Sequence, residues 1–219
     1  MAAAVTSMRG LRTVLALSAA LLWASALPVH AQNLPPAPTL TPGAGPAPQR
    51  SQQAAPQTHG AVLPITVQRP ATATAAIATR RGDFRIWYDP SLWRPAPESE
   101  DGRIELRHPN GQGVVVIIPE GTPLPLVALR TAAIENARRT APDARIVAEQ
   151  TRRIANRDVL LLQIEGTLSA GNRAVTYLGH YFGDPRGSIQ VVAATAQRDF
   201  ERLRTALQDA IDGLDLNRP

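Results

Sequence analysis

The sequence predicts an α+β domain, mainly an antiparallel β-sheet with two amphipathic helices packed on it, preceded by a disordered N-terminal region. Three observations predict this fold class. Acidic residues begin only at Asp83, segments with a period of two follow from there, and two segments repeat their apolar residues every three or four positions. We therefore expect a signal peptide at residues 1–31, a linker at 32–81 and a folded domain at 82–217.

Charge divides the chain at the same place. Residues 1–82 carry six arginines and no acid, whereas residues 83–219 hold 17 arginines and 18 acids, so the net charge of +5 belongs to the N-terminal part. A nucleic-acid-binding domain is expected to carry a basic excess on its folded surface, so no nucleic-acid partner is expected. The chain has no cysteine, which excludes disulfides, thiolate metal sites and a cysteine nucleophile.

The N-terminus has the layout of a secretory signal peptide. Two arginines precede an apolar run, and Val29-His30-Ala31 supplies small or modest residues where a signal peptidase reads, so cleavage is expected after Ala31. An uncleaved membrane anchor is the alternative, but Val14 to Leu27 is only 14 residues, against the roughly 20 that span a bilayer. The expected location is the periplasm, with transient membrane contact and no stable transmembrane helix.

Residues 32–81 are rich in Pro, Ala, Gln and Thr and lack both acids and an apolar period. Such a segment buries too little apolar surface to offset the entropy cost of ordering, so we expect it to be disordered. It would suit a spacer in the cell envelope, it could contact anionic lipid or wall polymer through its positive charge, or it is a tail with no partner.

The first three elements of the domain are predicted to form a three-stranded meander. Residues 84–88 and 104–108 alternate apolar with polar positions, and each stretch ends at a turn that contains proline. Residues 114–118 are five consecutive β-branched residues, which predict a strand that is buried on both faces and central in its sheet.

The second half of the domain is predicted as helix, four strands and helix. Residues 126–137 repeat apolar positions at three and four residues and end at Ala141-Pro142, which predicts a helix. The strands are expected at 145–153, 159–168, 175–182 and 188–195, with turns at 155–158, 169–172 and 183–187. Residues 200–214 carry one apolar stripe and predict a closing surface helix.

Three segments of this domain also carry a likeness to a known family. They are DFRIWYDPSLW at 83–93, TYLGHYFGDPRGSIQVVAAT at 176–195 and DFERLRTALQDAIDGL at 199–214. In type and order they resemble the PsbP-like family, an α/β/α sandwich shared by the extrinsic photosystem protein, the Mog-type Ran-binding proteins and many exported bacterial proteins. The resemblance covers Gly82 to Leu216. It implies a PsbP-like sandwich and a binding or assembly role, and it transfers no functional residue.

No catalytic signature accompanies this pattern. From residue 82 onward there is no Gly-rich phosphate loop, nucleophile elbow, paired-histidine zinc motif or calcium loop, so no cofactor or metal is expected. His180 is expected on one strand face with Leu178 and Phe182, while Tyr177 and Tyr181 lie on the other face.

Aromatic residues provide a candidate binding surface, formed by Trp87, Tyr88, Trp93, His180 and Tyr181. If the alternation holds, Trp87 points away from its apolar neighbours, and it either packs under a helix or lines a contact surface. The function expected is that of a periplasmic, non-enzymatic binding or accessory protein, acting on an envelope protein or a small ligand. The alternative is a small periplasmic enzyme with a pocket around His180, which requires this histidine in a cleft near an acid or hydroxyl.

Overall fold

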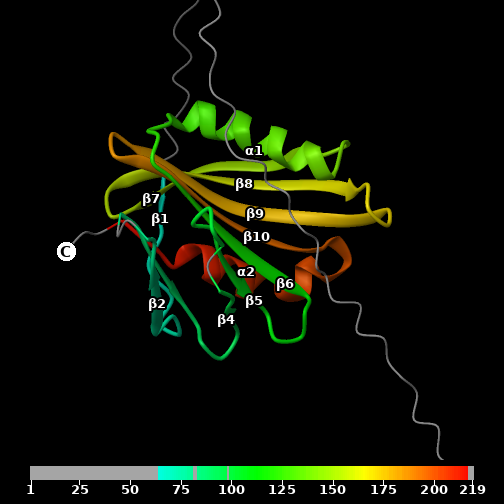
Figure 1. Cartoon of the computed structure of the whole chain (residues 1–219), viewed down its shortest axis with the longest axis horizontal. Coiled ribbons are helices and arrows are strands. Elements are labelled where there is room, and N and C mark those ends of the chain that lie inside the picture. The colour runs from blue at the N-terminus through cyan, green and yellow to red at the C-terminus, as the bar shows by residue number, and fades with distance from the viewer. Residues whose placement is uncertain (1–63, 81–82, 98, 217–219) are drawn as a thin grey trace, which may run out of the picture. The chain divides into compact units, whose positions relative to one another are not determined.

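The computed structural model describes residues 64–80, 83–97 and 99–216, and these residues form two β-sheets and two α-helices (Figure 1). The large sheet has the strand order β1-β7-β8-β9-β10-β6-β5-β4, and the small sheet has the order β11-β3-β2. The strands of the large sheet, in that order, are Ile65–Thr66, Arg145–Ile154, Arg157–Leu168, Arg173–Asp184, Gly187–Ala196, Gly113–Glu120, Ile104–Arg107 and Arg94–Pro95. Those of the small sheet are Leu214–Asp215, Arg85–Tyr88 and Ala75–Ala78.

The helices cover opposite faces of the large sheet (Figure 1). Helix α1 (Leu126–Thr140) packs on β8 and β9, while α2 (Phe200–Asp212), which follows a short 3₁₀ helix at Gln197–Asp199, packs on β10, β9 and β6. The predicted α+β class, with a mainly antiparallel sheet and two packed helices, is therefore confirmed. Among the described residues, neither α-helix has the length and apolar character that a bilayer-spanning helix requires.

Strand alternation divides the interior into two apolar clusters. On β9, Leu178 and Phe182 belong to the cluster under α2, whereas Tyr177 and Tyr181 belong to the cluster under α1. This confirms the predicted faces of the hairpin that contains His180. Strand β6 lies between β10 and β5 with both faces largely buried, so the central position predicted for residues 114–118 is also confirmed.

The predicted three-stranded meander is wrong. Strands β5 and β6 do pair as an antiparallel hairpin, but β3 pairs with β2 and β11 in the small sheet instead of with β5. The apolar alternation of residues 84–88 marks a strand and its buried face, and it carries no information about which strand lies alongside. The partners of β3 come from the two ends of the domain.

Helix α2 also ends earlier than predicted, because Leu214 starts β11 instead of extending the helix. The carbonyl oxygen of Gly213 accepts a hydrogen bond from the backbone N–H of Trp87 at 2.8 Å, which draws the chain into the small sheet. An added Cβ at Gly213 would overlap the carbonyl oxygen of Trp87. Only glycine permits this approach of the two backbones.

The expected linker at 32–81 is wrong in its last part, since residues 64–80 contribute strands β1 and β2. Strand β1 pairs in parallel with β7, and β2 pairs with β3. The sequence did not predict these strands because their segment is rich in Ala and Thr and has no apolar period. Their place in the sheets depends on backbone hydrogen bonds, which leave no such pattern. The folded domain thus begins before residue 82. The expected signal peptide and residues 32–63 of the linker lie outside the described residues.

Replacement of Gly213 with alanine is expected to disrupt the small sheet, because strand backbone cannot shift as a side chain can. We expect the free energy of unfolding to fall by about 3 kcal/mol and the melting temperature by roughly 10 °C, measured by circular dichroism. Gly113→Ala is the matched control, since its added Cβ would lie 3.5 Å from the nearest atom, an ordinary contact. Equal destabilisation by the two substitutions would contradict this account.

Candidate functional site

Four of the five residues predicted to form a binding surface lie in the interior. Trp93, His180 and Tyr181 expose at most 1 % of their surface, and Tyr88 exposes 9 %. Tyr181 belongs to the cluster under α1, whereas Tyr88 and Trp93 belong to the cluster under α2. The predicted surface is therefore not formed by these four side chains, because strand alternation and the packing of the helices bury them.

Trp87 is the exception, and it lies on the side of β3 that faces away from the buried Ile86 and Tyr88. Its indole Nε1–H donates a hydrogen bond to Oδ2 of Asp215 at 3.1 Å. The guanidinium carbon of Arg69 lies 4.2 Å from the ring centroid. Residues from two other segments, Asp215 and Arg69, thus hold a half-buried tryptophan on the outer side of the small sheet.

We define the Trp87 face as this outer side, formed by Arg69, Ala76, Ala78, Arg85, Trp87 and Asp215. Ala76 lies opposite Trp87 and Ala78 lies opposite Arg85 in the pairing of β2 with β3. Both alanines are exposed, and their side chains are too short to cover the neighbouring side chains of Trp87 and Arg85.

Cationic groups dominate the Trp87 face. The guanidinium carbon of Arg85 lies 6.0 Å from the Trp87 ring centroid, so both Arg69 and Arg85 lie beside the tryptophan on the outer side of the small sheet. Within the part of the chain that the structure describes, no carboxylate lies within ion-pair distance of either arginine. These guanidinium groups therefore keep donors that a bound partner could use.

His180 is enclosed beneath the end of α2. Its Nδ1–H donates to the carbonyl oxygen of Ile211 at 3.1 Å, while Nε2 has no hydrogen-bond partner and lies 3.7 Å from Oδ1 of Asp212. Burial lowers the pKa of His180 to about 3, so the ring is neutral at pH 7 and its contact with Asp212 is not an ion pair. The side chain has no exposed surface. The cleft that the enzyme alternative requires at His180 is thus filled by protein.

Asp212 forms the polar border of this buried histidine. Burial raises its pKa to about 6, partly offset by a hydrogen bond from Gln208 Nε2 at 2.7 Å and by Arg152, whose Nη1 lies 3.5 Å from the carboxylate. The negative charge of Asp209 adds to the rise. The group is therefore a structural carboxylate whose ionisation is disfavoured by its surroundings.

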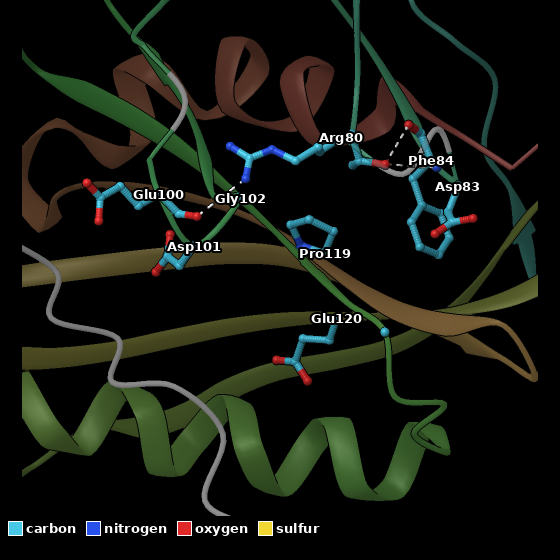
Figure 2. Close-up of a pocket in the computed structure, with 10 residues that line it drawn as sticks. Arg80, Asp83, Phe84, Glu100, Asp101, Gly102, Pro119 and Glu120 are labelled. Atoms are coloured by element: carbon cyan, nitrogen blue, oxygen red, sulfur yellow. Dashed lines mark hydrogen bonds between the residues drawn. The ribbon is translucent and has the colours of Figure 1, made fainter.

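The described residues also enclose a hollow of about 280 Å³, where the turn after β2, the β4–β5 loop and the end of β6 meet (Figure 2). Its acidic lining residues are Asp83, Glu100, Asp101 and Glu120, and Phe84 and Pro119 add apolar surface.

Several polar groups around the hollow already have partners. Arg80 Nη1 donates to the carbonyl oxygen of Glu100 at 3.5 Å, and the Glu120 carboxylate accepts from Gln190 Nε2 at 3.1 Å (Figure 2 shows the first of these contacts). Hydrogen bonds from Arg103, and then from Ser99, hold the pKa of Asp101 below its ordinary value. Across the described residues, no group of His, Asp or Glu side chains is arranged to hold a metal ion. The hollow is thus an acidic junction between loops.

The fold has counterparts among solved structures. Cyanobacterial PsbP (CyanoP) from Synechocystis sp. PCC 6803 matches with a TM-score of 0.51 at 9 % identity, covering 68 % of this chain and 95 % of that chain. A Pseudomonas aeruginosa protein of unknown function matches with a TM-score of 0.43 at 14 % identity, covering 66 % and 97 % of the two chains. LpqN from Mycobacterium tuberculosis, involved in cell envelope biogenesis, matches with a TM-score of 0.36 at 13 % identity, covering 57 % and 79 %. No protein-family model and no curated protein sequence matches this chain.

The match to the cyanobacterial protein shows that this chain has the PsbP-like fold, as the resemblance implied. At this level of identity the likeness concerns the fold alone. Sequence reasoning identified Trp87 through its alternation but missed Arg69 and Asp215, because neither lies near it in the sequence and no local pattern marks them.

Asp212→Asn is expected to change how stability depends on pH. Folding raises the pKa of Asp212 from 3.8 to about 6, so the folded state binds this proton more tightly than the unfolded state, and the carboxylate lowers stability progressively as the pH rises through this interval. Asparagine does not titrate. In urea unfolding, we expect the wild type to lose stability relative to Asp212→Asn between about pH 4 and about pH 7. A constant difference across this range would contradict the raised pKa.

Proposed function

We propose that this protein is an exported, non-enzymatic binding or accessory protein that contacts an envelope protein through the Trp87 face. The observation that carries the proposal is a half-buried tryptophan flanked by two arginines on an exposed sheet face. Tryptophan and arginine are enriched at the centres of protein interfaces, and their truncation costs the most binding energy. The PsbP-like resemblance, which implies a binding or assembly role, supports the same proposal.

The surroundings of Trp87 favour binding in a second way. The hydrogen bond to Asp215 and the stacked Arg69 guanidinium already restrict the indole ring before any partner arrives. A restrained side chain loses less conformational entropy on association, so more of the contact energy remains as affinity. The stacked arginine also presents apolar surface and hydrogen-bond donors together, which suits a mixed polar and apolar partner surface.

A small enzyme built around His180 is the less favoured function. Its anchor residue is fully buried, and its Nδ1–H is already donated to Ile211. A substrate would have to displace α2 to reach the ring, because Ile211 and Asp212 belong to that helix. The Trp87 face needs no such rearrangement.

Trp87→Ala is expected to abolish most partner binding. A photo-crosslinking amino acid at the exposed Ala78 would capture the partner in native cells, and the purified partner would then be titrated with wild-type and variant protein. We expect a loss of affinity of roughly 30-fold or more, as for a tryptophan at the centre of an interface. The matched control is Val127→Ala, a side chain that is 70 % exposed on α1, the helix that covers the opposite face of the large sheet from α2. If both variants bind equally to the captured protein, the Trp87 face is not the contact surface.

Export is part of the same proposal and rests on the layout of residues 1–31. The protein recovered from the periplasm is expected to begin at Gln32, as determined by N-terminal sequencing or intact mass. A chain that stays in the cytoplasm with its original N-terminus would contradict export. A chain that stays membrane-bound and begins at Met1 would support the alternative of an uncleaved anchor.

A further inference from the structure

We infer that the partner docks as an extended strand with acidic side chains along the outer edge of β2, which deepens the proposed function and rests on it. Strand β2 is one of the two edge strands of the small sheet, next to β3. It borders the Trp87 face directly, since Ala76 and Ala78 belong to both. A strand added here would extend the sheet and lie beside that face.

Hydrogen-bond directions identify the backbone groups that face this edge. The Trp87 N–H donates toward β11, and the Thr79 N–H donates to the carbonyl oxygen of Phe84 at 3.0 Å. In an antiparallel pair, successive residues alternate between facing the partner strand and facing away from it. Ala76, which is paired with Trp87, and Ala78 therefore direct their N–H and C=O groups away from β3.

The edge of β2 is open in the part of the chain that the structure describes. Ala76 and Ala78 form no backbone hydrogen bond on this side, and both are exposed. Proteins usually protect such edges with charged residues, proline or a bulge. Residues 71–79 contain no charge and no proline, and β2 pairs with β3 without a register shift. This is the kind of edge to which an extended peptide adds through main-chain hydrogen bonds.

The two arginines of the Trp87 face outnumber its single carboxylate, Asp215, and this cationic excess favours an acidic partner. Neighbouring strands lie about 4.8 Å apart, so Arg85 on β3 would lie roughly 10 Å from an added strand, a distance that an arginine and a glutamate side chain span together. Ala78 lies between them and is too short to block this approach. Because no carboxylate of the described residues pairs with Arg85 or Arg69, acidic side chains on that strand would gain charge-assisted hydrogen bonds.

Two other occupants of the edge fit less well. Residues 1–82 contain no Asp or Glu, so neither the N-terminal segment of this chain nor the β2 strand of a second copy can supply the acidic side chains. Self-pairing of two β2 strands would also place the Arg85 side chains of both copies on one continuous face, where like charges repel. An acidic segment of a different protein is the occupant that the charges favour.

Two synthetic peptides test the inference, one alternating valine with glutamate and the other alternating valine with lysine. Each is titrated into the isotope-labelled exported chain while the backbone amides are followed by NMR. We expect the glutamate peptide to shift the amides of Ala76 and Ala78 and slow their hydrogen exchange. The inward-facing amide of Ile77 should change less, and the lysine peptide should have no effect. Equal binding of the two peptides, or no response of the β2 amides, would overturn the inference.

Substitutions on β2 and β3 test separately the contribution of the β2 edge and that of the Trp87 face to peptide binding. Ala76→Pro removes an outward N–H without removing a hydrogen bond to β3, and it should weaken the glutamate peptide about tenfold or more. Ala76→Thr keeps the N–H and serves as the matched control. If Ala76→Pro does not fold, Arg85→Glu provides the test, because this exposed substitution should reverse the preference toward the lysine peptide.

The outcomes distinguish this inference from the proposed function. If partner binding is lost in Trp87→Ala but kept in Ala76→Pro, the partner uses the Trp87 face without adding a strand, and only the strand inference fails. If partner binding survives Trp87→Ala and is lost in Ala76→Pro, strand addition stands and the role proposed for the tryptophan fails. Protection of the Ala76 amide in a self-associated dimer without any peptide would identify a second copy as the occupant and overturn the inference.

Discussion

The close backbone contact between Gly213 and Trp87 is the interaction on which the small sheet depends. Helix α2 is fixed to the large sheet by its apolar stripe, and the residue after the helix is held against β3 by a hydrogen bond of 2.8 Å. The contact therefore ties the small sheet to the main core and sets β11 beside β3. With β3 held in this position, its alternate side chains must point outward, and the indole ring reaches Asp215. A glycine at the end of a helix thus determines how a tryptophan is presented.

Burial separates the groups that could meet a partner from those that cannot. The hairpin of β9 and β10 contains Tyr177, His180, Tyr181 and Phe182, yet nearly every side chain in it is enclosed by the two helices. His180 is held there in its neutral form, because burial disfavours the charged ring and the positive charge of Arg152 disfavours it further. The β2–β3–β11 sheet has no helix on its outer side among the described residues. Polar and aromatic side chains on that side remain accessible because no helix of the described residues covers them, whereas those of the hairpin are covered by α1 and α2.

Much of the element order could be predicted because the signals are local. Apolar alternation, a run of β-branched residues and helical spacing marked every strand from β3 to β10 except the two-residue β4, as well as both helices. Alternation also placed Trp87 on the side of its strand opposite Ile86 and Tyr88. Pairing could not be predicted for β3, because its neighbours come from segments far away in the sequence and its side-chain pattern is compatible with many partners. Strands β1 and β2 lacked an apolar period. The burial of Trp93 and Tyr88 depends on α2 and the small sheet, which residue type alone does not reveal.

The position of β11 at residues 214–215 has a consequence for the order in which the chain acquires its surfaces. The β-strands and helices of the large sheet can be synthesised and brought together before residues 214 and 215 exist, whereas β3 lacks one of its two neighbours until they do. Contacts between residues so distant in sequence form late, because the intervening chain must be ordered first. A chain that is cut before residue 214 would keep the strands and helices of the large sheet and lack a completed Trp87 face. Recognition through that face would therefore select molecules in which β11 has paired with β3.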